Sequence, residues 1–247
     1  MSPGRVAVGA LLCLLIGGCG GSSPLRVSAA ASLKAAFTAY GGSLPHRPAF
    51  SFAGSDELAA QIRQGARPDL FASANTALPD ALHRDGRLEP PVPFAANRLV
   101  LAAPGSGARV GSLADAARPG VKIAIGAPSV PIGAYTRQVL ARLGPATARA
   151  VQANVRSEEP DVAGIVGKLT QGAADAGFVY MTDVRASGGR LRAIPLPPRA
   201  QPRVVYAAAV VRGTSHRAAA RAFVRGLLSG AGRRALLAAG FEPPPPR

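Results

Sequence analysis

Two serines stand where a short apolar run ends and a helical pattern begins. Ser32 follows the run 27–31, and Ser55 follows the run 49–53. The first turn of a helix carries N–H groups without intrahelical partners and a partial positive charge, so a serine there presents several donors to an anion. Serine is also a preferred N-cap residue, and capping alone accounts for both positions.

Three further residues offer similar chemistry through other groups. Ile132 and Val162 stand at predicted helix starts and would present backbone N–H groups. Tyr180 ends an apolar run and would present a phenolic hydroxyl, although a core tyrosine with a satisfied hydroxyl fits the same pattern. Because hydrogen bonds to a charged acceptor are stronger than neutral ones, neutral donors of this kind suit a dehydrated oxyanion. The pattern therefore supports a small-oxyanion site as a hypothesis.

Strands and helices must alternate to bring these residues together. Hydropathy and turn residues predict strands at 25–28, 49–53, 70–73, 98–103, 121–125, 151–155, 176–179, 191–194 and 204–211. They predict helices at 33–40, 56–64, 76–84, 112–117, 133–143, 161–171, 215–228 and 231–239. Such repeats indicate an α/β protein whose parallel sheets are covered on both faces, with ligands at the carboxyl ends of the strands.

The pattern leaves two domain organisations open. The apolar strands predicted at 98–103 and 204–211 each stand beside a proline-rich stretch, as expected if the chain crosses twice between two lobes. A single doubly wound sheet with proline-rich loops explains the same observations, and the pattern alone does not choose between them.

The net charge of +16 first suggests a nucleic-acid partner. The arginines that supply most of it are scattered, however, and Arg233–Arg234 is their only adjacent pair. Aromatic residues make up 5% of the chain and tryptophan is absent, so no platform for stacking bases is evident. We therefore expect a solvated arginine surface and no nucleic-acid partner.

The only cysteines, Cys13 and Cys19, lie in the N-terminal segment. The rest of the chain therefore cannot form a disulfide framework, a thiolate nucleophile or a cysteine-ligated zinc site. No grouping of histidine and carboxylate residues has metal-ligand spacing either.

The N-terminal segment is read as a targeting signal. Arg5 precedes an apolar run, 6–16, that is too short to span a bilayer. Small residues stand directly before Cys19, as in a bacterial lipobox. We therefore expect a signal peptide at 1–18 and a lipidated Cys19 beginning a tether at 19–24, with an ordinary secretory signal as the alternative. Either places the mature protein outside the cytoplasm, and the lipid would anchor it to the membrane.

An extracytoplasmic serine hydrolase is the alternative from a different functional class. A serine nucleophile needs a base within hydrogen-bond reach, and the chain offers only His46, His83 and His216. No Gly-x-Ser-x-Gly elbow occurs. The segment 164–169 lacks the spacing of a phosphate-binding P-loop. We expect a binding protein rather than an enzyme, with no cofactor.

Several short segments, in order, resemble one known family. They are 29–33 (AAASL), 52–55 (FAGS), 68–75 (PDLFASAN), 130–135 (VPIGAY) and 177–180 (GFVY). Together they resemble the molybdate-binding proteins of bacterial ABC importers, over about 25–241.

That resemblance implies a fold, a ligand and partners. The fold would be the two-lobed type II periplasmic-binding-protein fold, α/β, each lobe a mixed or parallel sheet flanked by helices, with the ligand in the hinge cleft. Lobe 1 would comprise 25–97 and 204–247, and lobe 2 would comprise 98–203. The ligand would be molybdate, and tungstate would bind similarly, with the metal present only inside the oxyanion. A permease would be the membrane partner of a monomeric protein.

The resemblance also assigns roles to residues. Ser32 and Ser55 would each donate a hydroxyl and a backbone N–H, Ile132 and Val162 would donate backbone N–H groups, and the Tyr180 hydroxyl would complete the shell. This chain departs from the family in Gly54 and Asp56 around Ser55, in the bulk of Ile132 and in Asn75. A sulfate- or phosphate-binding protein of the same fold is the alternative. An iron-binding relative would need clustered tyrosines, and Tyr40, Tyr135, Tyr180 and Tyr206 are dispersed.

Overall fold

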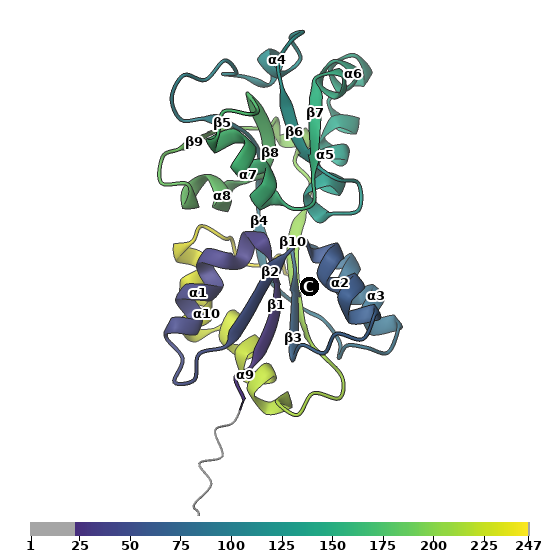
Figure 1. Cartoon of the computed structure of the whole chain (residues 1–247), viewed down its shortest axis with the longest axis vertical. Helices are drawn as coiled ribbons and strands as arrows, with labels where there is room; N and C mark the ends of the chain where they lie inside the picture. The colour runs from purple at the N-terminus through teal and green to yellow at the C-terminus, as the bar shows by residue number, and fades with distance from the viewer. Residues whose placement is uncertain (1–22, 247) are drawn as a thin grey trace, which may run out of the picture.

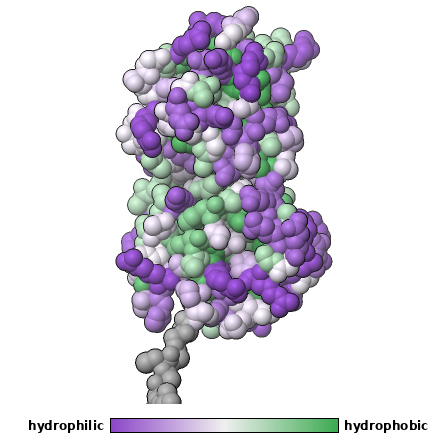
Figure 2. Space-filling view, viewed as in Figure 1, coloured by the Kyte–Doolittle hydropathy of each residue, from purple (hydrophilic) through white to green (hydrophobic). Residues whose placement is uncertain are grey.

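The computed structural model describes residues 23–246. The predicted signal peptide at 1–18, the lipidation at Cys19 and most of the tether lie outside the described residues. Within 23–246, no helix combines the length and the apolar composition that crossing a bilayer requires. Hydrophilic side chains cover much of the face shown in Figure 2.

The first lobe is built on a five-stranded sheet in the order β2-β1-β3-β10-β4. Its strands are β1 (Arg26–Ala30), β2 (Ala49–Ala53), β3 (Leu70–Ser73), β4 (Val92–Asn97) and β10 (Val204–Val210). β1 runs parallel to β2 and β3, whereas β10 is antiparallel to β3 and β4. Its helices are α1 (Lys34–Gly42), α2 (Ser55–Arg63), α3 (Ala77–Arg84), α9 (Arg217–Leu228) and α10 (Gly230–Ala238) (Figure 1).

Alternating side chains of this sheet enter two separate cores. In β3, Leu70 and Ala72 join the large core that includes α1, α9 and α10, whereas Phe71 joins the core under α2 and α3. In β10, Ala208 joins the large core and Ala209 joins the core under α2 and α3. Because successive strand residues point to opposite faces, runs without polar alternation are expected for a sheet covered on both faces.

The second lobe contains another five-stranded sheet, in the order β7-β6-β8-β5-β9. Its strands are β5 (Leu99–Pro104), β6 (Ile123–Gly126), β7 (Val155–Glu159), β8 (Ala176–Tyr180) and β9 (Leu191–Ile194). β6 is parallel to β7 and β8, and β5 is antiparallel to β8 and β9. Its helices are α4 (Leu113–Ala116), α5 (Pro131–Arg142), α6 (Pro145–Ala153), α7 (Val162–Thr170) and α8 (Met181–Ala186).

The chain passes between the sheets twice. The first passage is at Arg98, between β4 and β5, and the second is at 195–203, between β9 and β10 (Figure 1). Two short 3₁₀ helices, η1 (Ala31–Leu33) and η2 (Pro198–Ala200), complete the described elements. The two-lobed α/β architecture is confirmed, with mixed sheets, and the single doubly wound sheet is wrong.

The sequence analysis did not predict the strand β4, and one of its assignments is wrong. The proline-rich stretch after α3 leads into β4 and includes Pro93, which the sheet tolerates because β4 is an edge strand. The strand expected at 151–155 is the end of α6, and the strand follows as β7. Gly144, at φ 88°, and Pro145 at the first helical position start α6, a signal that the apolar residues near Val151 obscured.

Candidate functional site

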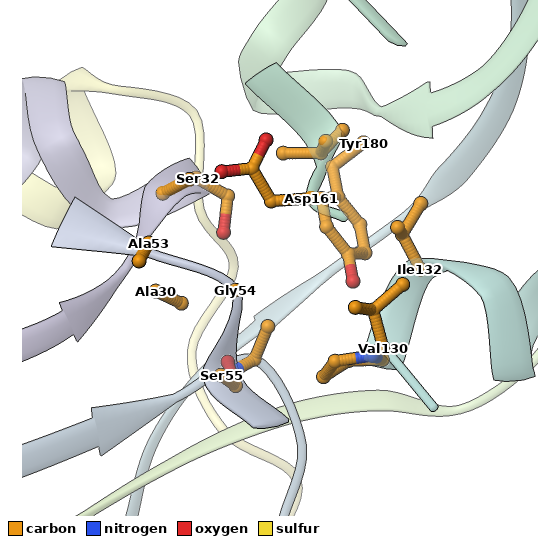
Figure 3. Close-up of a pocket in the computed structure, with 13 residues that line it drawn as sticks. Ala30, Ser32, Ala53, Gly54, Ser55, Val130, Ile132, Asp161 and Tyr180 are labelled. Atoms are coloured by element: carbon orange, nitrogen blue, oxygen red, sulfur yellow. The ribbon is translucent and has the colours of Figure 1, made fainter. Parts of the chain in front are cut away.

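A small cavity of ≈ 20 Å³ lies between the lobes, where segments that directly follow strands of both sheets converge. All of the residues predicted as oxyanion donors line it: Ser32, Ser55, Ile132, Val162 and Tyr180. Figure 3 shows the serines on the side of lobe 1 and Ile132 and Tyr180 on the side of lobe 2. The remaining lining residues are Ala30, Ala31, Ala53, Gly54, Ala74, Val130, Pro131 and Asp161.

Ser32 does not cap a helix. It is the second residue of η1, whose N-cap position is held by Ala30, and its side chain makes no capping hydrogen bond. Its hydroxyl instead lies 2.9 Å from the hydroxyl of Tyr206, which comes from the middle of β10. The capping interpretation of Ser32 is therefore wrong, and its hydroxyl is held by a residue distant in sequence.

Ser55 also does not cap its own helix. Gly54 occupies the N-cap position of α2, and Ser55 is the first helical residue. Its Oγ accepts a hydrogen bond of 3.1 Å from the backbone N–H of Ala74, just beyond β3. This contact uses an oxygen lone pair, so the hydroxyl proton of Ser55 is available to a ligand in the cavity.

Ile132 lies in the first turn of α5, directly after Pro131 at the first helical position. N–H groups in this turn have no intrahelical carbonyl to bond. Gly133 allows the helix start to lie against the end of β6, since a Cβ at Gly133 would overlap the carbonyl oxygen of Ala127. This close approach directs the start of α5 toward the cavity.

Val162 is the first residue of α7. The preceding Asp161 is a true N-cap, because its carboxylate accepts a 2.9 Å hydrogen bond from the N–H of Gly164. In Figure 3 the Asp161 carboxylate points away from the Tyr180 hydroxyl. Val162 therefore lines the cavity beside a carboxylate that is engaged by its own helix.

Tyr180 ends β8 and immediately precedes α8, a helix that the sequence analysis did not predict. The residue is 1% exposed, yet its hydroxyl has no hydrogen-bond partner among the described residues. Burial raises the pKa of Tyr180 well above its usual value, so the group remains a neutral donor. The hydroxyl therefore has no geometric hydrogen-bond partner among the described residues, and it borders the cavity.

Asp183 lies behind Tyr180 in the first turn of α8. Burial raises the pKa of Asp183 to about 7, against the lowering effect of a hydrogen bond from the Tyr180 N–H, and the negative charge of Asp161 adds to the rise. Near neutral pH this carboxyl is therefore divided between its neutral and charged forms.

Asp56, a departure from the family pattern, does not line the cavity. Its Oδ2 accepts a 2.7 Å hydrogen bond from Ser129, so it joins α2 of lobe 1 to the start of α5 in lobe 2. Gly54 lies at the same junction, since a Cβ there would come within 2.6 Å of the Pro160 carbonyl oxygen. The described structure is thus a closed arrangement of the lobes.

Asn75, the other polar departure, acts within lobe 1. Its Oδ1 accepts hydrogen bonds from the N–H of Leu78 and the hydroxyl of Ser73, each 3.1 Å long, so it organises the turn into α3.

Sequence reasoning missed the residues behind Ser32. Tyr206 is fully buried, and besides Ser32 it contacts the amide nitrogen of Asn97 at 3.5 Å. The same nitrogen donates a 2.9 Å hydrogen bond to Thr182 in α8. The sequence offered one sign that Asn97 has a special role, since it is a polar residue at the end of an apolar edge strand. Nothing in the local sequence distinguishes Tyr206 from an ordinary aromatic residue of the core.

The cavity can bind an anion without any cationic side chain. Among residues 23–246, no lysine or arginine lines it, and Asp161 is its only charged lining residue. The converging groups are hydroxyls and the N–H groups of helix starts, which donate hydrogen bonds to an oxyanion and add partial positive charge. Neither Ser32 nor Ser55 has a histidine among its hydrogen-bond partners in the described part of the chain, as serine hydrolysis would need.

Comparison with known proteins places the chain in a family. Residues 25–242 match the family model described as bacterial extracellular solute-binding protein. The molybdate-binding protein ModA of Mycobacterium tuberculosis H37Rv is 40% identical over 231 residues, covering 91% of this chain and 86% of that protein. ModA of Haemophilus influenzae is 30% identical over 205 residues and 78% of each chain.

A solved structure agrees in fold. The periplasmic molybdate-binding protein of Azotobacter vinelandii superposes with a TM-score of 0.80 over 90% of this chain and 100% of that chain, at 24% identity. The chain therefore belongs to the bacterial extracellular solute-binding proteins, in the group of the ModA proteins.

Proposed function

We propose that this protein captures molybdate, and tungstate with it, outside the cytoplasm and delivers it to an ABC importer. The observation that carries the proposal is the cavity between the lobes, in which donors from both lobes surround the unpartnered hydroxyl of Tyr180. The ModA relatives support molybdate as the ligand, and they are solute-binding proteins rather than enzymes.

In this proposal the oxyanion accepts hydrogen bonds from both lobes. Ser32 and Ser55 donate from lobe 1 through hydroxyl and backbone N–H groups. Ile132 and Val162 donate backbone N–H groups from lobe 2, and Tyr180 donates its hydroxyl. No separate cofactor takes part, since the metal arrives inside the oxyanion. Because the donors are fixed on two lobes, sulfate is too small to reach both sets at once.

The proposal extends to the rest of the chain. Residues 1–18 act as a signal peptide, Cys19 carries a lipid, and 19–24 tether the protein to the membrane. Lobe 1 comprises 25–97 and 204–247, and lobe 2 comprises 98–203. The protein works as a monomer that presents its loaded, closed lobes to the permease subunits.

An anion panel tests the proposal. Purified protein lacking residues 1–22 is titrated by calorimetry with molybdate, tungstate, sulfate and phosphate, and its melting temperature is recorded with each, because a ligand that binds only the folded state stabilises it. We expect molybdate and tungstate to bind and the others to be silent. Binding of sulfate or phosphate with no response to molybdate would favour the alternative oxyanion-binding function.

A further inference from the structure

The hydroxyl of Ser32 lies at the end of a buried chain of polar groups. Asn97, 5% exposed, ends β4 at the first passage between the lobes. Its amide nitrogen lies 3.5 Å from the Tyr206 hydroxyl, and that hydroxyl lies 2.9 Å from the Oγ of Ser32. This series of polar groups therefore begins at the first passage between the lobes, passes through the fully buried Tyr206 of β10 and ends at the cavity.

The donors and acceptors among these groups can be assigned from the protons that each atom carries. The N–H of Arg98 donates to Asn97 at 2.9 Å, and since a backbone N–H can only donate, the Asn97 atom that receives it is the carbonyl oxygen. The NH₂ group of Asn97 therefore faces Thr182 and Tyr206 and donates to both. The Tyr206 oxygen accepts one of these protons. Its own buried proton needs an acceptor, and the Oγ of Ser32 is the acceptor that the described residues offer within hydrogen-bond distance.

This assignment leaves the hydroxyl proton of Ser32 without a partner in the series. Its oxygen accepts the Tyr206 proton, so its own proton is free of that contact, and the side chain lies beside the cavity (Figure 3). A hydroxyl rotor normally has no fixed sense and can accept as readily as it donates. Here the Tyr206 hydroxyl occupies one of the two lone pairs of the Ser32 oxygen, and the Ser32 proton is left for an acceptor in the cavity.

We propose that Tyr206 is a positioning residue that directs the hydroxyl proton of Ser32 toward the oxyanion. The inference rests on the proposed function, because it concerns how the same cavity holds its ligand. Tyr206 does not line the cavity itself, so it acts through Ser32.

Tyr206 also contacts the donor of the opposite lobe. Its ring packs edge-on against the ring of Tyr180, with centroids 5.9 Å apart and an angle of 65° between the planes. One side chain on β10 thus supports a donor in each lobe, through a hydrogen bond to Ser32 and through ring packing to Tyr180. Replacing Tyr206 by phenylalanine removes the first support and keeps the second.

The test is a double-mutant cycle on molybdate affinity. Tyr206→Phe is expected to weaken binding on the order of tenfold, at the upper end of the range for a hydrogen bond between neutral groups. In a Ser32→Ala background, Tyr206→Phe is expected to change the affinity by less than about twofold, because the group through which it acts is gone. In a Ser55→Ala background the full loss is expected, since Ser55 bonds Ala74 instead.

Tyr40→Phe is the matched control. Tyr40 is a buried tyrosine of lobe 1 whose hydroxyl donates to the Phe223 carbonyl oxygen at 3.3 Å, away from the cavity. It is expected to lower the melting temperature to a similar degree while leaving molybdate affinity unchanged. This comparison separates a loss of stability from a loss of positioning.

The outcomes are distinct. Unchanged affinity in Tyr206→Phe, or an equal loss with and without Ser32, would overturn the positioning role while the function stands. Failure of the unsubstituted protein to bind molybdate would overturn the proposed function and this inference together.

Discussion

Ser32 and Ser55 occupy similar places but are held by different partners. Tyr206 holds the first through its hydroxyl, and the N–H of Ala74 holds the second. In both cases the serine oxygen has a partner in lobe 1, and its proton can serve a ligand. The residues that look interchangeable in sequence therefore depend on separate parts of the lobe.

Removing either hydroxyl tests the binding site at this scale. Ser32→Ala and Ser55→Ala are each expected to weaken molybdate binding by about 1.5–3 kcal/mol, the range for a hydrogen bond to a charged group. Isothermal titration calorimetry measures the change. Normal affinity in both variants would show that the ligand binds elsewhere.

At the scale of elements, the start of α5 depends on a glycine. Gly133→Ala places a methyl group into overlap with the carbonyl oxygens of Ala127 and Gly126, so the helix start must shift away from β6. We expect the shift to displace the Ile132 N–H, to weaken molybdate binding by about tenfold or more, the loss expected for a hydrogen bond to a charged group, and to lower the melting temperature.

A second glycine supplies the control for this prediction. Gly167, inside α7, has open space where the Cβ of an alanine would project. Gly167→Ala is expected to leave affinity unchanged and to raise stability by about 0.5–1 kcal/mol, because alanine is the better helix residue. Equal binding by the two variants would contradict the role given to the helix start.

The junction of β8 and α8 carries the pH dependence. Because the pKa of Asp183 is raised from 3.8 to about 7 on folding, the folded state holds this proton more tightly than the unfolded state. Its contribution to stability is full below pH ~4 and is lost as the pH rises to ~7. Asp183→Asn is expected to melt several degrees higher than the parent at pH 8, with the difference vanishing near pH 4. Parallel melting curves across that range, recorded without ligand, would refute the assignment.

A buried carboxylate at the other end of lobe 1 has a structural role. Burial alone would raise the pKa of Asp69, but hydrogen bonds from Thr214, the Arg26 N–H and His216 lower it below its usual value. Ser23 in turn lies 3.3 Å from the Nε2 of His216. The contacts resemble a serine–histidine–aspartate arrangement, yet they tie the beginning of β1 to the segment before α9.

At the scale of the molecule, closure brings the two sets of donors together. Ser129→Ala removes the hydrogen bond to Asp56 across the lobes and is expected to weaken molybdate binding several-fold, because the closed state loses a charge-assisted contact. Small-angle scattering is expected to show the parent compacting on molybdate addition, and the variant needing more ligand to do so. Identical profiles with and without saturating molybdate would contradict closure.

The sequence predicted the alternation of elements and, with the family resemblance, a set of residues that line one cavity between two lobes. The local pattern left capping open as an explanation of Ser32 and Ser55, because the groups that engage their hydroxyls lie far away along the chain. It missed the hydrogen bond between Tyr206 and Ser32 for the same reason. Local rules describe what a residue can do within a turn or two, whereas these roles depend on strands that meet only after the sheets form.

The division of the donors between lobes has a consequence for unloading. Within the described chain no cationic side chain lines the cavity, and in the proposed binding mode each lobe supplies only part of the hydrogen bonds. When the lobes separate, the ion therefore loses the hydrogen bonds of one lobe in a single step, and water reaches the donors of the other lobe. The residence time of the ion would then be set by how often the hinge opens. A permease would release the ion by moving the two lobes apart, without any competing ligand.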